Sequence, residues 1–130
     1  MADAEAISRV PWCEEAEAAF RSHPDTAEDL DNIRRNVQED SAQLWRFTGP
    51  ATMWLVTRVE RYPSGRRELV LVNAIGRNSR AVLDVCDHMA RRIGAETVRA
   101  HVKSSPLIRI LKARGWREHR IVMKKVMADV

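Results

Sequence analysis

The chain has 130 residues, 45% of them hydrophobic and 31% charged, which suffices for one domain with its own core and is too little for two. No apolar run approaches the ~20 residues that a membrane helix needs, and the acidic N-terminus is unlike a secretory signal, so we expect a cytoplasmic protein. The two cysteines, Cys13 and Cys86, lie far apart with no histidine cluster beside them, which speaks against a disulfide framework and a zinc site.

The charge is distributed unevenly along the chain. From Met1 to Ser41 there are 11 acidic residues and four arginines, whereas from Arg91 to Lys125 there are 11 basic residues and two acidic ones. This division suits an acidic partner, a contact between the two halves of the fold, or head-to-tail contacts between copies, and we expect a protein partner or self-association. Nucleic acid is a third possible partner, but no helix-turn-helix or zinc pattern accompanies the basic residues, so a solvated basic surface is the preferred interpretation.

The N-terminal third is predicted to hold a strand and two helices. The strand is Ala6–Val10, and the first helix spans 12–20, with glutamates near its positive end. Asp25 and Glu28 have the spacing of a capping box, and the apolar residues that follow recur at helical intervals as far as Val37. A second helix to about Val37 is therefore expected.

From residue 42 the hydrophobic pattern changes to a period of two, which predicts antiparallel strands. The expected strands cover 43–47 and 53–60, and a third begins near Arg67 after the turn signal Pro63-Ser64-Gly65. Three antiparallel strands would thus precede the second half of the chain.

The stretch 69–116 is predicted as strand, helix, strand, helix. The run Leu69–Val72 is apolar on both faces, as in a central strand. The helix from Ser79 to Gly94 carries an apolar stripe that we expect to be buried: Val82, Val85, Cys86, Met89 and Ile93. A helical crossover of this length makes the strand at 98–102 parallel to the first strand. An edge strand, or a bent pair of strands, is expected over 116–127.

This order of elements resembles the GNAT family of N-acetyltransferases over almost the whole chain. The most specific local likeness is the helix end before the last strands, Leu111-Lys112-Ala113-Arg114-Gly115-Trp116. The segment at 90–97, ARRIGAET, is similar to the step between helix and strand in that family. The sequence QLWR at 43–46, together with LKARGW, also resembles small GNAT-like proteins encoded among bacteriophage morphogenesis genes.

The resemblance implies a fold and a cofactor. The fold is an α/β (α+β) class with a single domain over 1–130, in which antiparallel N-terminal strands lead into a parallel βαβ unit with helices on both faces. Acetyl-CoA would lie between the fourth and fifth strands, with its diphosphate on the amides that begin the next helix. The residues that match this cofactor-binding loop are Ile75, Gly76, Arg77, Asn78, Ser79 and Arg80.

The loop departs from the family pattern. The family has small residues at two positions of the loop, and if Arg77 takes the first loop position, Arg80 and Val82 occupy those two. Side chains of this size would stand where the diphosphate approaches the backbone, although Arg77 and Arg80 would attract phosphate. We therefore expect weak binding of acetyl-CoA or none.

The catalytic residues implied by the resemblance are also incomplete. The position of the family's tyrosine acid holds Leu111, and Tyr62, the only tyrosine, falls in the hairpin turn. The resemblance implies a carboxylate base on the fourth strand or a neighbouring one, and Glu68 or Glu60 could take this role. The alternative for both is an ordinary ion pair with a neighbouring arginine: Arg58, Arg66 or Arg67.

Two functions follow from this combination. The first is a GNAT-fold protein without acyl transfer and without a cofactor, acting as a binding or assembly component, for example of a bacteriophage particle in the virion or host cytoplasm. The alternative is an acetyl-CoA-dependent N-acetyltransferase with a divergent diphosphate loop. No metal ligands are predicted in either case.

Overall fold

The computed structural model describes residues 6–48, 52–76, 79–102, 105–119, 123 and 125–127. Its elements in chain order are β1 (Ala6–Val10), α1 (Glu14–Ser22), α2 (Pro24–Ala27), α3 (Leu30–Gln38), β2 (Gln43–Thr48), β3 (Met53–Arg61), β4 (Arg67–Ile75), α4 (Ser79–Ile93), β5 (Thr97–Ala100) and α5 (Ser105–Ala113).

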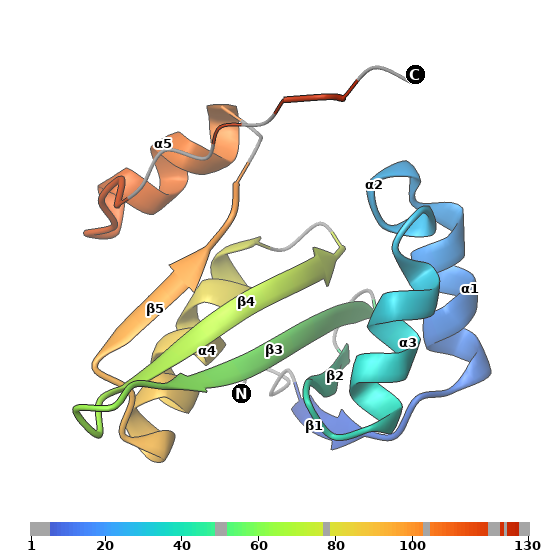
Figure 1. Ribbon diagram of the computed structural model, residues 1–130, viewed down its shortest axis with the longest axis horizontal. Coiled ribbons are helices and arrows are strands. Elements are labelled where there is room, and N and C mark those ends of the chain that lie inside the picture. The colour runs from blue at the N-terminus through green and yellow to red at the C-terminus, as the bar shows by residue number, and fades with distance from the viewer. Residues whose placement is uncertain are drawn as a thin grey trace, which may run out of the picture.

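The strands form one mixed sheet in the order β1-β2-β3-β4-β5 (Figure 1). The first three pairings are antiparallel, and β4 and β5 are parallel neighbours with α4 between them in sequence. The predicted α/β (α+β) class, with antiparallel strands leading into a parallel βαβ unit, is confirmed.

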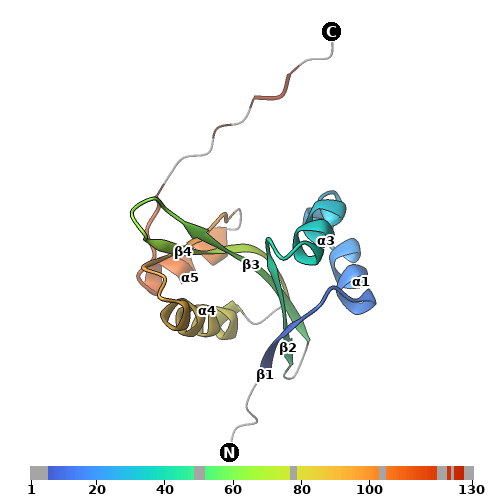
Figure 2. The ribbon, with the colours of Figure 1, turned by 60° about the horizontal axis from the view of Figure 1, so that its bottom comes forward.

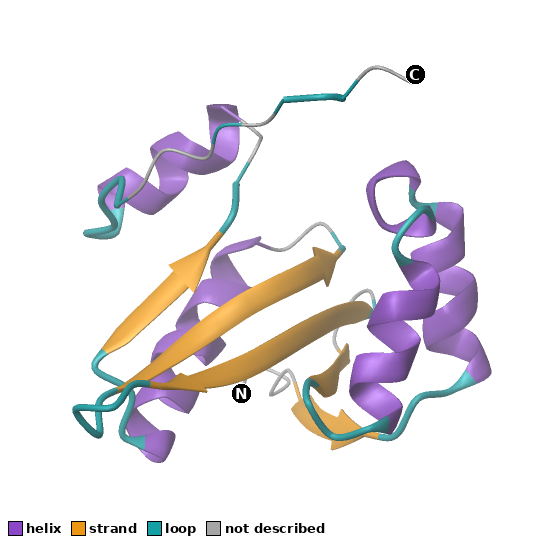
Figure 3. Ribbon diagram, viewed as in Figure 1, coloured by secondary structure: helices purple, strands orange, loops and turns teal. Residues whose placement is uncertain are grey.

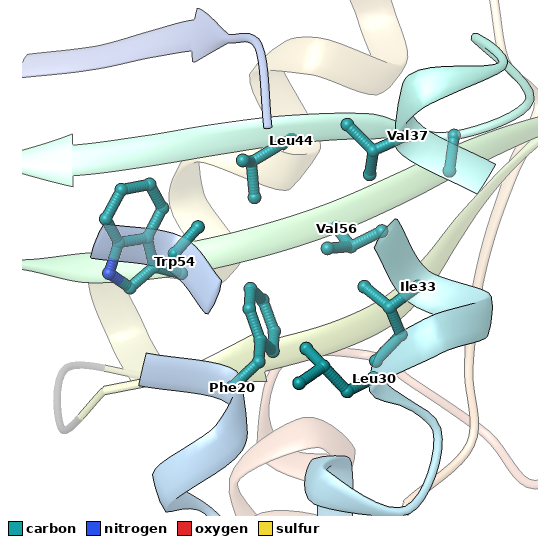
Figure 4. Packing of buried hydrophobic residues seen from close by; sticks show 9 residues of the cluster. Phe20, Leu30, Ile33, Val37, Leu44, Trp54 and Val56 are labelled. Carbon is teal, nitrogen blue, oxygen red and sulfur yellow. The ribbon is translucent and has the colours of Figure 1, made fainter. Parts of the chain in front are cut away.

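Helices pack on both faces of this sheet, α1–α3 on one and α4 on the other (Figures 2 and 3). Alternation along the strands separates the two cores. In Figure 4, side chains of α1 and α3 point toward residues of β2 and β3 that share one face: Leu44, Trp54 and Val56. Residues of the opposite parity on the same strands, such as Phe47 and Leu55, pack with the α4 side instead.

The predicted second helix is broken in two at Glu28 and Asp29. Its first part is the short α2, which begins at Pro24, and α3 starts only at Leu30. The buried hydroxyl of Thr26 donates a hydrogen bond of 2.6 Å to the carbonyl of Phe20. This side-chain bond ties the turn to the end of α1, six residues earlier, and the hydrophobic period does not report such bonds.

Removing the Thr26 hydroxyl should therefore destabilise the fold. The change Thr26→Val keeps the side-chain shape and leaves the Phe20 carbonyl without this donor, so we expect a loss of about 1 kcal/mol in the free energy of unfolding, measured by urea denaturation. Ser22→Ala is the matched control, because the Ser22 hydroxyl makes the same kind of bond, to Ala19, on an exposed surface. Equal losses in the two variants would contradict a role for burial.

The apolar stripe of α4 is rotated from its predicted position. The buried side chains are Leu83, Cys86 and Ala90, and of the predicted stripe, Val85, Met89 and Ile93 are only partly buried. The side chain of Val82 lies outside the described part of the structure. The expectation of a buried stripe is thus confirmed for Cys86, whereas Val85, Met89 and Ile93 pack against the same core but stay partly exposed. Burial raises the pKa of the Cys86 thiol to about 12.

The predicted C-terminal strand is absent among the described residues of 116–127. Instead, the Trp116 amide bonds to the carbonyl of Leu111, and Lys112 and Glu118 form an ion pair at 3.3 Å. These local contacts hold 116–118 against α5. Residues 120–122 and 124 lie outside the described residues. Within the described ranges, no helix has the length and apolar character of a membrane span.

Candidate active site

β4 and β5 stay paired over only part of β4. Their register runs from Glu68 opposite Thr97 to Leu71 opposite Ala100. β5 then ends, whereas β4 continues to Ile75, still paired with β3 on its other side. In the described part of the chain, the last four residues of β4 therefore have no strand partner on the side of β5. A strand edge without a partner strand is one that a ligand can pair with.

A β-bulge lies where the two strands part. Val56 pairs with Asn73 and Thr57 with Leu71, which leaves Val72 as an extra residue in β4. Val72 is 39% exposed, unusual for an apolar residue in a central strand. A bulge bends its strand and redirects the neighbouring side chains. The bulge therefore accounts for the divergence of β4 from β5.

Beyond the bulge, the chain turns from β4 into α4 at Gly76. Gly76 has a φ of +146°, and a Cβ atom there would lie 2.4 Å from Cγ of Met53. The glycine is thus required by close packing on β3. α4 begins three residues later, at Ser79, so the amides of its first turn lie just beyond the end of β4. A helix N-terminus in this position is suited to an anion.

The predicted cofactor-loop residues are distributed unevenly in the structure. Ile75 packs against the core formed with α1 and α3. Gly76 makes the turn described above, and Arg77 and Asn78 lie outside the described residues. Ser79 and Arg80 are in the first turn of α4, where the structure describes the backbone only.

The two carboxylates predicted as bases lie opposite each other on β3 and β4, within a set of bonded polar side chains. We call this set the hairpin network, and its members are Arg58, Glu60, Tyr62, Glu68, Thr97 and Arg99. Arg99 donates to Glu60 at 2.8 Å and lies 3.2 Å from Glu68. The Tyr62 hydroxyl and the Thr97 hydroxyl each donate to Glu68 at 2.8 Å.

These contacts hold both carboxylates in the ionised form. Burial alone would raise the pKa of Glu68, but the bonds from Thr97 and Tyr62 and the charge of Arg99 outweigh it and lower that pKa. The pKa of Glu60 is also lowered, because two arginines outweigh its burial. The bond to Glu68 and burial raise the pKa of the Tyr62 hydroxyl. A carboxylate with a lowered pKa is a weak proton acceptor.

The prediction of an ordinary ion pair is confirmed for Arg58, which bonds to Glu60 at 2.8 Å. Arg66 and Arg67 have other roles: the Arg66 guanidinium lies over the Tyr62 ring, 5.0 Å from its centroid, and Arg67 donates to the carbonyl of Ile93. Sequence reasoning missed Arg99. The signal was its parity on β5, since Val98 packs on the α4 side and Arg99 must then point to the other face.

The hairpin network does not lie at the point where β4 and β5 part. Glu68 is three residues before Leu71, about 10 Å along a strand, and it faces away from α4 because its neighbour Leu69 packs on the α4 side. The position of the family's tyrosine holds the buried Leu111. No group of residues able to hold a metal ion occurs within the described ranges.

A mixed sheet whose parallel strands part at a bulge, with a helix starting just beyond the longer strand, defines the GNAT fold, and the chain has this fold. No protein-family profile and no curated protein matches the sequence. Solved structures do match in fold. One is a probable acetyltransferase, with a TM-score of 0.71 and 10% identity, over 96% of this chain and 98% of the other.

Two further similar structures come from bacteria. The ribosomal-protein-alanine N-acetyltransferase of Brucella melitensis biovar Abortus 2308 has a TM-score of 0.63 and 13% identity, over 91% of this chain and 99% of its own. A predicted acetyltransferase of Clostridium acetobutylicum, solved with acetyl-CoA, has a TM-score of 0.63 and 10% identity, over 93% and 96%. At these identities the likeness extends to the fold alone. The predicted resemblance to phage proteins found no support.

Proposed function

We propose that this protein binds acetyl-CoA in the gap between β4 and β5 and transfers the acetyl group to an amine. The observation that carries the proposal is the unpaired edge of β4 over 72–75, which ends at the N-terminus of α4. The fold-level likeness to acetyltransferases, one of them solved with acetyl-CoA, supports it.

The described residues fit such a cofactor at two points. The open backbone edge of β4 can pair with the amide groups of the pantetheine arm, as a strand would. The amides of the first turn of α4 can receive the diphosphate. Gly76 is accounted for by its packing on Met53, so the proposal does not depend on a glycine-lined cradle.

Acetyl-CoA supplies the reactive thioester, and the chain supplies positioning. Leu111 cannot donate a proton to a departing thiolate, so that proton comes from water in this proposal. Glu68 and Glu60 lie too far along their strands for direct contact with an amine at the divergence, and they act through intervening water. In this proposal the bonded side chains of the hairpin network form a rigid, charged part of the sheet near the site where the amine binds.

The non-catalytic function remains the second candidate. Two observations favour it: the carboxylates are already paired with arginines, and Leu111 offers no acid. A binding component would need the fold but no residues for acetyl transfer. The two candidates differ in whether acetyl-CoA binds and whether its thiol is released.

The binding experiment uses a side chain that fills the gap. Ala74 is exposed on the unpaired part of β4, and Ala74→Trp should weaken acetyl-CoA binding at least about tenfold by calorimetric titration, because the indole would occupy the path of the pantetheine arm. Ser8→Trp is the control, since Ser8 is exposed on the far edge strand. No binding by the unchanged protein, or equal binding by all three proteins, would refute the proposed site.

Transfer is tested separately by release of the CoA thiol with a panel of primary amines. Binding with no amine-dependent thiol release would favour the non-catalytic candidate. Amine-dependent release that is lost in Ala74→Trp and kept in Ser8→Trp would support transfer at this site.

A further inference from the structure

Asp40 is an unusual residue for its position just after α3. It follows the C-cap residue Glu39 and has a φ of 61°, and no other non-glycine residue in the described part of the chain has a positive φ. Glycine adopts this conformation without strain and is the usual residue at this position. The negative end of the helix dipole also disfavours a carboxylate here. Asp40 is therefore unfavourable for stability on two counts, and such residues are concentrated at functional sites.

The contacts of the Asp40 carboxylate do not compensate for these costs. Among the described residues it has one ionic partner, the Arg9 guanidinium at 3.7 Å, which is beyond hydrogen-bond distance. The Asp40 and Arg9 side chains are 85% and 53% exposed, and exposed pairs of this kind contribute little to stability. The two opposite charges thus lie close together, and a ligand can replace their mutual contact at small cost.

Both charged side chains line a groove of about 520 Å³, formed by the end of β1, the connection to α1, the end of α3 and the start of β2. Its lining includes the buried Val37 and Leu44, which belong to the core shown in Figure 4. Trp12 also lines the groove. Its ring stacks on Phe20 with 5.8 Å between the centroids, and its indole N–H donates a hydrogen bond to Glu17. The groove is thus held by fixed side chains and has the size of a small-molecule site.

The paired charges at the groove favour a zwitterion. A ligand with a single charge would meet one attractive and one repulsive group, since Arg9 and Asp40 lie 3.7 Å apart. In an α-amino acid the ammonium and the carboxylate are attached to the same carbon atom. The ammonium can therefore donate to Asp40 while the carboxylate accepts from the planar guanidinium of Arg9. An apolar side chain on the same carbon atom would cover the apolar lining: Trp12, Val37 and Leu44.

We propose that this groove binds a free α-amino acid with a bulky apolar side chain. Asp40 receives its ammonium, Arg9 binds its carboxylate, and its side chain packs on the apolar lining. The requirement for a carboxylate at the groove explains why residue 40 is not glycine. No residue of the gap between β4 and β5 lines the groove, so this inference is independent of the proposed function.

The first test is calorimetric titration of the full chain with L-phenylalanine and two analogues. We expect L-phenylalanine to bind with a dissociation constant below about 1 mM. The analogue 2-phenylethylamine lacks the carboxylate and 3-phenylpropanoate lacks the ammonium, so each should bind at least about tenfold more weakly. No binding of L-phenylalanine, or equal binding of all three compounds, would overturn the proposal.

The second test separates binding from stability at residue 40. Asp40→Gly should weaken L-phenylalanine binding at least about tenfold and at the same time raise the urea midpoint of unfolding, because glycine relieves the backbone strain. Asp40→Asn, which tolerates the same backbone conformation, should also weaken binding.

Glu39→Gly is the matched control. It removes the same charge from the same turn, but Glu39 has a φ of −89° and does not line the groove. This variant should keep binding and lower the urea midpoint, since glycine gains no relief at a negative φ. Unchanged binding in both Asp40 variants, equal loss of binding in Glu39→Gly, or a lower midpoint in Asp40→Gly would contradict a ligand-binding role for Asp40.

Discussion

Replacing Gly76 by alanine should lower the free energy of unfolding by about 3 kcal/mol, because the change combines two costs. Its φ of +146° is one that L side chains rarely adopt, and the new Cβ atom would lie 2.4 Å from Cγ of Met53. Met53 is 4% exposed and has little room to move. Urea denaturation followed by tryptophan fluorescence measures the loss.

Gly65→Ala separates the two costs. Gly65 has a φ of +87°, and a Cβ atom there would meet nothing within 4 Å, so only the conformational cost applies, about 1 kcal/mol. In the double variant Gly76→Ala with Met53→Ala, the close contacts to Cγ and Cε of Met53 are removed and only the 2.9 Å approach to the Cβ atom of residue 53 remains, so the combined loss should be smaller than the sum of the single losses. Additive losses, or equal losses at Gly65 and Gly76, would show that Met53 does not constrain the turn.

The sequence predicts those parts of the fold whose hydrophobic pattern lies within a single helix, strand or connection. The apolar run of β4 and the parallel crossover to β5 were read correctly, because strand burial and crossover length are local properties. The break between α2 and α3 was not predicted, since the turn before it is fixed by a side-chain bond from Thr26 to the carbonyl of Phe20, and the hydrophobic period does not report such bonds. The C-terminal segment shows the same limit, because alternation predicts a strand but provides no neighbour for it.

The candidate site could be predicted only in part for the same reason. Glu60 and Glu68 were recognised from their place on the hairpin, and the structure pairs them opposite each other. Arg99 and Thr97 lie on β5, 29 or more residues after Glu68 in the sequence. They reach the two carboxylates only because the parallel register places Thr97 beside Glu68. Parallel register is set by tertiary packing, not by a local turn.

Replacing Arg99 by methionine should destabilise the protein by about 2 kcal/mol at pH 7, because it leaves two carboxylates without their shared cation. The side chain of Glu68 is 10% exposed and that of Arg99 is 21% exposed, so burial is substantial but incomplete, and the cost is at the lower end for a broken buried pair. Methionine keeps the length and apolar character of the arginine stem. Arg91→Met is the control, since Arg91 is exposed on α4, and its loss should be within ~0.5 kcal/mol.

The destabilisation should depend on pH in a defined direction. In the wild type the pKa values of Glu60 and Glu68 are lowered by folding, so their contribution to stability is present above the unfolded pKa of about 4.3 and is lost as the pH falls through the folded values. In Arg99→Met the burial that raises the pKa of Glu68 is opposed by the bonds from Thr97 and Tyr62 but no longer by the charge of Arg99, so this pKa is higher in the variant than in the wild type. As the pH falls from 7 toward 4, Glu68 takes up a proton in the variant, and the stability cost of a buried carboxylate without Arg99 decreases. The wild type instead loses stability below about pH 4.

The difference in unfolding free energy between wild type and Arg99→Met should therefore be largest near pH 7 and shrink steadily toward pH 4, as measured by urea denaturation at each pH. A difference that is the same at both ends of this range would mean that Arg99 does not neutralise the carboxylates. The lowered pKa of Glu68 would then be due to its bonds from Thr97 and Tyr62, and the lowered pKa of Glu60 to Arg58. A shrinking difference would show that Arg99 helps to keep the carboxylates ionised, which makes them weak proton acceptors.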